Sequence, residues 1–176
     1  DRYISNTYQV KYSEEEHELV GISQYIIDIQ KFISTVSSTN KSILIEGDHG
    51  CEHLTLAASI HCNSLQGNND LYNLNCKKLN VLKNPLNYLE KLKNIKRGSI
   101  FISNIDNLDQ SLQFKLLDII SSLSDSVRIL ASSEQNLKSE VNSGRFNRKL
   151  YFFVSDVMFY LPRLKERKED IPYILE

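Results

Sequence analysis

Apolar residues along this chain repeat in two different ways, and the two patterns alternate. Over residues 22–36 they recur every three or four positions, which predicts a helix with one apolar stripe. Residues 42–45 form a short apolar run before a glycine, which is typical of a buried strand. The alternation continues and predicts strands at 71–76, 99–105, 127–131 and 157–161, and helices at 51–62, 86–92, 110–123 and, for the most part, 137–153.

Short apolar strands separated by amphipathic helices indicate an α/β fold, in which helices cover both faces of a parallel sheet. Residues 1–18 are polar and include three consecutive glutamates, so we expect a linker or the tail of an upstream domain there. Residues 19–176 are then expected to form one domain, because this length suffices for a hydrophobic core.

Composition excludes several functional classes. The chain has 21 Lys and Arg against 22 Asp and Glu, whereas a domain that grips nucleic acid mainly by charge would be strongly basic. Its 3 cysteines lack CxxC spacing and are typical of reduced thiols in a cytosolic protein. The apolar runs are too short to span a bilayer. We therefore expect a cytoplasmic location and no membrane partner.

The most informative segment is the turn after the first predicted strand, because parallel α/β sheets bind ligands at the carboxyl ends of their strands. A phosphate-binding loop reads GxxxxGK[ST]: its glycines let backbone N–H groups close around phosphate, its lysine supplies a cation, and its hydroxyl binds Mg²⁺. The corresponding residues here are Gly47, Asp48, His49, Gly50, Cys51, Glu52 and His53. Glu52 replaces the second glycine, His53 the lysine and Leu54 the hydroxyl.

These replacements weaken the turn as a phosphate site. Glu46, Asp48 and Glu52 place carboxylates around a site for a polyanion, and two like charges about 4 Å apart repel by roughly 1 to 4 kcal/mol. His53 has a reference pKa of about 6.5 and is mostly neutral at pH 7. We expect a structural connection without a ligand, and residual nucleotide or phosphate binding is the alternative.

A metal site is a further alternative for the same turn, because His49 and His53 are four residues apart. We do not favour it, since His49 is expected to lie in the loop rather than on a shared helix face. The other candidate ligands are Cys51, Glu52, His61 and Cys62.

Motifs in the rest of the chain, in the same order, resemble the AAA+ domain of bacterial sigma-54-dependent transcriptional activators, many of which are response regulators. The matching segments are LVGIS at 19–23, IEGDHG at 45–50, AASIHCNS at 57–64, LNC at 74–76, GSIFI at 98–102, LQFKLL at 112–117, VRILA at 127–131, GRF at 144–146 and LPRLKERKEDIP at 161–172. The resemblance implies a P-loop NTPase of AAA+ type, a three-layer α/β/α subdomain with a mostly parallel sheet of about five strands. We expect the family's helical lid to be absent from this chain.

The same resemblance identifies family positions that have changed. The family's Walker B motif ends in Asp-Glu, which supports Mg²⁺ and polarises the attacking water; Ser103 and Asn104 stand there. The two family arginines taken to act on a neighbouring subunit's nucleotide align with Asn147 and Phe153. The family's GAFTGA loop, which contacts sigma-54, has no counterpart in residues 80–97.

Two other features have family explanations. We interpret the basic run at 163–168 as a solvated helix-entry segment, because acidic residues are interspersed in it. The C-terminal aromatic residues are expected in the core or at a subunit interface, not on a nucleic-acid stacking platform. They are Phe152, Phe153, Phe159 and Tyr160.

The concerted changes predict a degenerate AAA+ domain, a pseudo-ATPase with a regulatory, scaffolding or oligomerisation role in a transcription regulator, with no catalytic residues and no resident cofactor. The alternative is a nucleotide-binding or weakly active AAA+ ATPase that binds ATP or ADP and activates sigma-54 RNA polymerase. Expected partners are other domains of the same regulator and further copies of this chain. We expect no contact with sigma-54, and DNA binding only through a domain outside these residues.

Overall fold

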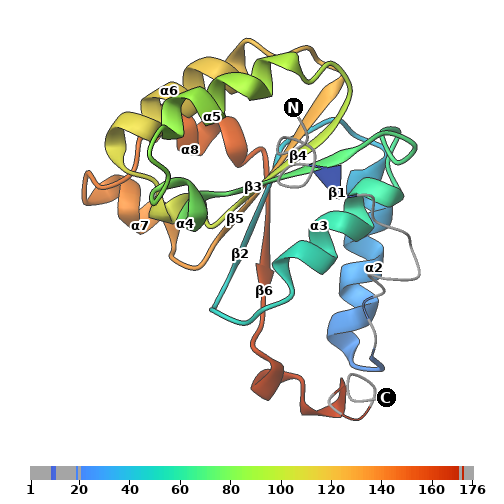
Figure 1. Ribbon diagram of the computed structural model, residues 1–176. Helices are drawn as coiled ribbons and strands as arrows, with labels where there is room; N and C mark the ends of the chain where they lie inside the picture. The colour runs from blue at the N-terminus through green and yellow to red at the C-terminus, as the bar shows by residue number, and fades with distance from the viewer. Residues whose placement is uncertain (1–8, 11–18, 20, 171, 173–176) are drawn as a thin grey trace.

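The computed structural model describes residues 9–10, 19, 21–170 and 172, which form a three-layer α/β domain (Figure 1). Its sheet has the strand order β1-β3-β4-β5-β2-β6, and β1 pairs antiparallel with β3 whereas all the other pairs are parallel. The predicted α/β class with a mostly parallel sheet is therefore confirmed. The strands are β1 Gln9–Val10, β2 Ile43–Gly47, β3 Leu71–Asn75, β4 Gly98–Ser103, β5 Val127–Ser133 and β6 Val157–Leu161.

Helices cover both faces of this sheet. Figure 1 shows α2 and α3 on one side, and α5, α6 and α8 on the other. The α-helices are α2 Gln24–Ser37, α3 His53–Cys62, α4 Cys76–Leu79, α5 Pro85–Glu90, α6 Gln110–Ser121, α7 Leu137–Asn142 and α8 Arg148–Val154. Short 3₁₀ turns are η2 Lys91–Asn94, η3 Ile105–Asn107, η4 Leu164–Glu166 and η5 Lys168–Asp170.

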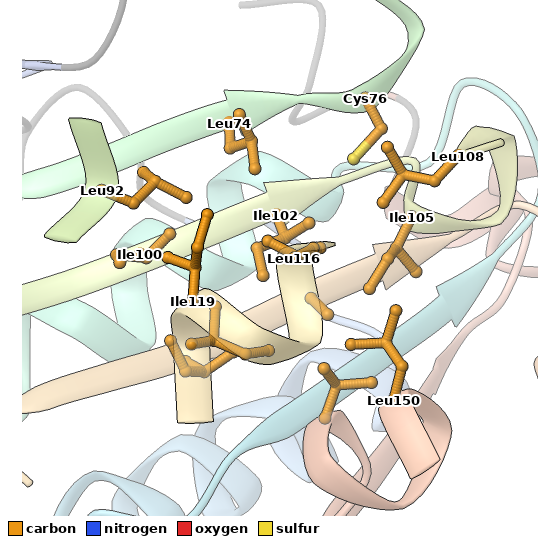
Figure 2. Packing of buried hydrophobic residues seen from close by; sticks show 14 of the residues in the cluster. Leu74, Cys76, Leu92, Ile100, Ile102, Ile105, Leu108, Leu116, Ile119 and Leu150 are labelled. Atoms are coloured by element: carbon orange, nitrogen blue, oxygen red, sulfur yellow. The ribbon is translucent and has the colours of Figure 1, made fainter. Parts of the chain in front are cut away.

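The hydrophobic core is divided in two by the sheet. One cluster packs α2 and α3 against β2 and includes Ile29, Ile45 and Leu56. The other packs β3 and β4 against α6 and α8, as Figure 2 shows for Ile102, Leu116 and neighbouring side chains. Strands β2, β4 and β5 are buried along their whole length because helices cover both of their faces, whereas β6, at the edge of the sheet, alternates between buried or partly buried and exposed residues.

The predicted helix at 137–153 is in fact two helices. Gly144 adopts a φ of +75°, a left-handed conformation that ends a helix, and so α7 stops just before it. A new helix, α8, then begins after Asn147, whose side chain accepts hydrogen bonds from the Lys149 and Leu150 amides at 2.8 and 3.0 Å. The apolar periodicity had masked this break.

Two further segments differ from their expected form. Strand β5 continues two residues beyond the predicted end because Ser132 and Ser133 are buried. Residues 9–10, within the expected linker, pair with β3, while the rest of 1–18 lies outside the described residues.

Between β3 and β4, residues 80–97 fold into α5 and η2, and bury Leu89 and Leu92 in the core.

Strand register brings the chemistry-bearing segments to one edge. Strand β2 lies between β5 and β6, with Glu46 opposite Ser133 and Gly47 opposite Leu161. Since the strands are parallel, the turn after β2 and the segments after β3, β4, β5 and β6 all leave the sheet at its carboxyl edge.

Candidate functional site

The turn after β2 keeps the backbone form of a strand-to-helix loop. The Cys51 amide donates to the Asp48 carbonyl at 3.1 Å, and the His53 amide donates to the Cys51 carbonyl at 2.9 Å. Gly50 has a φ of +84°, which favours glycine. Gly47 is required for a different reason: a Cβ built there would lie 2.8 Å from the Leu161 Cβ.

His53, at the lysine position of the motif, folds back onto its own turn. Its Nδ1 lies 3.1 Å from the Cys51 carbonyl, and because a carbonyl only accepts, Nδ1 carries the proton. Burial lowers the pKa of the ring below its usual value, although nearby backbone and acidic groups partly oppose this. His53 is therefore neutral at pH 7, as expected, and supplies no cation to the turn.

The three carboxylates of the turn do not face one another, so the mutual repulsion that we expected between them is not seen. Asp48 pairs with Arg163, and Glu52 pairs with Arg167. The Glu46 side chain points away from the turn and toward α7, where its Oε1 accepts the Leu137 amide hydrogen at 2.9 Å. Each acid of the turn is thus satisfied from within the chain.

The basic segment at 163–168 was expected to be solvated, and this expectation is wrong for Arg167. That residue is only 6% exposed, lies over the Tyr25 ring at 5.5 Å, and has Asp170 at 3.9 Å as a second acidic neighbour. Arg163 remains half-exposed beside Asp48. Arg167 is buried because it bonds to Glu52 of the turn after β2, and the linear charge pattern could not indicate this pairing.

Asp170 anchors the same segment to the start of α2. Its carboxylate accepts the Ile22 and Ser23 amide hydrogens at 2.8 Å each, and the Ser23 hydroxyl at 2.6 Å. Burial alone would raise the pKa of Asp170, but these hydrogen bonds outweigh it and lower the pKa. A Cβ at Gly21 would lie 2.4 Å from the Asp170 Cγ, so only glycine permits this approach.

Strand β4 ends in neutral side chains. The Ser103 hydroxyl is buried and donates to the Asn73 side-chain oxygen at 3.1 Å. Asn104 has a φ of +56°, a conformation that asparagine tolerates, and its amide donates to Glu134 Oε1 at 2.9 Å. Neither side chain carries the negative charge that the family's Asp-Glu pair would bring to a Mg²⁺ ion, and both form hydrogen bonds within the chain.

Sequence reasoning missed the carboxylate of Asp106, two residues further on. Its Oδ1 accepts the Glu134 amide hydrogen at 3.3 Å and its Oδ2 accepts from Asn107 at 3.0 Å. Burial raises the pKa of Asp106, and the Glu134 charge adds to this, although hydrogen bonds oppose it. Asp106 thus holds the segment after β5 through the Glu134 amide, and no family motif had indicated this residue.

Asn147 and Phe153 have structural surroundings of their own. Asn147 caps α8, and its amide donates to Gln113 Oε1 at 2.7 Å. Phe153 lines a groove with Ser42 and Val127, at the amino edge of the sheet opposite the turn. Nearby Arg145 makes two 2.7 Å hydrogen bonds to Glu140. Of the other aromatics, Phe159 is partly buried and packs on Phe32 beside the core, whereas Phe152 and Tyr160 are exposed.

Metal-ligating residue types do not converge in the part of the chain that is described: no group of three His, Cys, Asp or Glu side chains there could hold a metal ion. His61 instead lies 2.8 Å from the Ser99 hydroxyl and 3.0 Å from the Asn69 carbonyl. Among the described residues, Cys51, Cys62 and Cys76 form no disulfide. Among the described helices, none is both long and apolar enough to cross a bilayer.

The sheet order and the strand-to-helix turn after β2 give this chain the fold of AAA+ P-loop NTPase domains. A solved P-loop NTPase domain of a sigma-54 activator from E. coli matches 82% of this chain with a TM-score of 0.62 and 16% identity. More specifically, the chain belongs to the Sigma-54 interaction domain family, whose model matches residues 20–164.

The relatives are longer proteins. The anaerobic nitric oxide reductase transcription regulator NorR of Klebsiella pneumoniae (strain 342) is 29% identical, over 89% of this chain and 36% of its own length. The transcriptional regulatory protein ZraR of Escherichia coli (strain K12) is 29% identical, over 89% of this chain and 41% of its own. The structure of NtrX from Brucella abortus in complex with ADP matches 99% of this chain and 44% of NtrX, with a TM-score of 0.79 and 24% identity. This chain thus spans less than half of each of these relatives.

Proposed function

We propose that this chain is the AAA+ domain of a transcription regulator and that it does not hydrolyse ATP. The observation that carries the proposal is the neutral end of β4, where Ser103 bonds to Asn73 and Asn104 bonds to Glu134. Hydrolysis by P-loop NTPases needs carboxylates that support Mg²⁺ and orient the attacking water. Ser103 and Asn104 are both neutral and bring no carboxylate to either task.

The pairing of the turn after β2 supports the same proposal. A bound polyphosphate would lie against Asp48 and Glu52, whose arginine partners come from the segment after β6. With neutral His53 in place of lysine, the turn offers no free cation of its own to offset those charges. In this proposal the domain acts through contacts with other proteins or domains and not through hydrolysis. It serves as a regulatory, scaffolding or self-associating unit beside other domains of the regulator.

A second candidate function is nucleotide binding without turnover, in which ATP or ADP is a structural effector. Two observations favour it. The turn keeps Gly47 and Gly50, with Gly50 in the left-handed conformation that lets a backbone wrap an anion. In addition, NtrX from Brucella abortus, similar in fold, was crystallised with ADP and with ATP.

One pair of measurements on the intact parent protein separates these candidates. Calorimetric titration with ATP or ADP plus Mg²⁺ reports binding, and a phosphate-release assay reports turnover. We expect no release above background. Measurable turnover would overturn the proposal, whereas tight binding without release would favour the second candidate.

A variant that combines His53→Lys with Glu52→Gly is the positive control for binding. It restores the cation and the glycine of the motif, and it also frees Arg167 from Glu52, so we expect it to raise phosphate affinity. Because Arg167 then loses its partner, circular dichroism must show that the variant remains folded.

A further inference from the structure

Glu134, directly after β5, receives hydrogen bonds from three separate segments, namely helix α4, the turn after β2 and the residue after β4. The Lys77 Nζ lies 2.8 Å from both of its carboxylate oxygens. The Asn104 side-chain amide lies 2.9 Å from Oε1, and the His49 Nδ1 lies 3.0 Å from the same oxygen. These donors follow β3, β4 and β2 respectively, so a single carboxylate ties together the carboxyl ends of four neighbouring strands.

The donors around Glu134 form the kind of set that binds a free anion. An ammonium group, an amide N–H and an imidazole N–H converge on one position, as donors do around a phosphate group. The backbone behind the carboxylate is also fixed, because the Glu134 amide donates to Asp106 Oδ1 at 3.3 Å. The backbone of Glu134 is therefore held in place by the sheet, while the donors His49 and Lys77 reach it with side chains that are 87% and 40% exposed.

The carboxylate is ionised in this position. Partial burial alone would raise the pKa of Glu134, but the hydrogen bonds and charges of Lys77 and His49 outweigh it and lower the pKa. Its side chain is 19% exposed, which limits competition from water.

We propose that Glu134 is an internal anion that occupies the site formed by His49, Lys77 and Asn104, so that the domain closes this anion site without a ligand. An external phosphate must displace the carboxylate or lie beside it and be repelled. The inference rests on the proposed function, since a domain that does not turn over nucleotide has no need to open this site.

The test is phosphate binding by the Glu134→Ala variant of the whole chain. Calorimetric titration with inorganic phosphate, and with tripolyphosphate, should show about tenfold tighter binding than the wild type, because Lys77 and Asn104 are freed and one negative charge is lost. Adding Lys77→Met to Glu134→Ala should abolish the gain.

Glu140→Ala is the matched control. Glu140 is 18% exposed and pairs with Arg145, so its removal changes the net charge equally and also frees a cation. Arg145, from the same region of the chain, is the donor to the Glu140 carboxylate, so no set of donors from separate strand ends converges there within the described residues, and we expect no gain in phosphate affinity. Equal gains in the two variants would overturn the proposal, because the effect would then be one of general charge.

Glu134→Gln covers the case in which the alanine variant does not fold. It keeps an acceptor for Lys77 but removes the charge, and it should also bind phosphate more tightly than the wild type. If a folded Glu134 variant gains no phosphate affinity while the wild type shows no ATP turnover, this inference fails and the proposed function stands. Turnover by the wild type overturns the proposed function whatever Glu134 does.

Discussion

Gly47 is the last residue of β2 and lies in register with Leu161 of β6. A Cβ there would approach the Leu161 Cβ to 2.8 Å, the Leu161 carbonyl oxygen to 3.0 Å and the His53 Nε2 to 3.1 Å. The glycine kept from the phosphate-loop motif thus has a packing role that needs no phosphate. Packing alone therefore explains the glycine at this position, and its presence does not by itself indicate a ligand.

We accordingly expect Gly47→Ala to destabilise the fold by about 1 to 3 kcal/mol, because two paired strands must separate to admit the methyl group. Gly50→Asn, in the same turn, is the control: an added Cβ there meets nothing within 4 Å, and asparagine tolerates the positive φ. Urea denaturation of both variants measures the difference. An equal loss of stability in the two would contradict the steric explanation.

Among the elements, the segment after β6 depends on side chains far more than on regular structure. It consists of two 3₁₀ turns, η4 and η5, and is held through Arg163, Arg167 and Asp170. We expect Asp170→Ala to cost about 1 to 3 kcal/mol, since the part-buried Ile22 amide and the buried Ser23 amide lose their charged acceptor.

Glu169→Ala is the control for this substitution, because Glu169 is exposed on the same 3₁₀ turn. Urea denaturation should show a loss of stability for Asp170→Ala alone. Limited proteolysis should cut that variant faster between residues 161 and 170. If both variants resemble the wild type, Asp170 is not the anchor that its contacts suggest.

At this same scale, the sequence predicted most elements but few of their contacts. Periodicity found the strands because burial on both faces leaves a continuous apolar run, as in β4. It could not find the partners of Glu134, which lie 85 residues away at His49 and 57 away at Lys77, because they depend on strand order. The pairing of Arg167 with Glu52 spans 115 residues and was missed for the same reason.

For the whole molecule, pH should reveal how the carboxyl edge is held together. The hydrogen bonds and charges of arginine, lysine or histidine partners lower the pKa of Asp48 and of Glu134, and hydrogen bonds from Ser23 lower that of Asp170. Such groups stabilise the fold above their unfolded pKa, and this stability is lost as pH falls through the folded pKa. Burial raises the pKa of Glu46 and of Asp106. Their ionised carboxylates therefore lower the stability of the fold at neutral pH, and this stability is regained when they are protonated.

The free energy of unfolding should accordingly hold or rise slightly between about pH 7 and pH 5 and fall below about pH 4, near the ordinary carboxyl pKa. Urea denaturation across this range measures it. Asp170→Asn should make the loss of stability below pH 4 less steep, since it removes one of the carboxyl groups whose pKa is lowered by folding. A stability that keeps rising below pH 4 would show that the buried acids dominate.

The place of β2 within the sheet also has a consequence for how the molecule is made. Both of its neighbours, β5 and β6, are encoded more than 80 residues later, so a nascent chain exposes the apolar stretch of β2 until residues 127–161 have left the ribosome. Synthesis that stalled before residue 127 would leave this stretch without either neighbour, a natural client for chaperones.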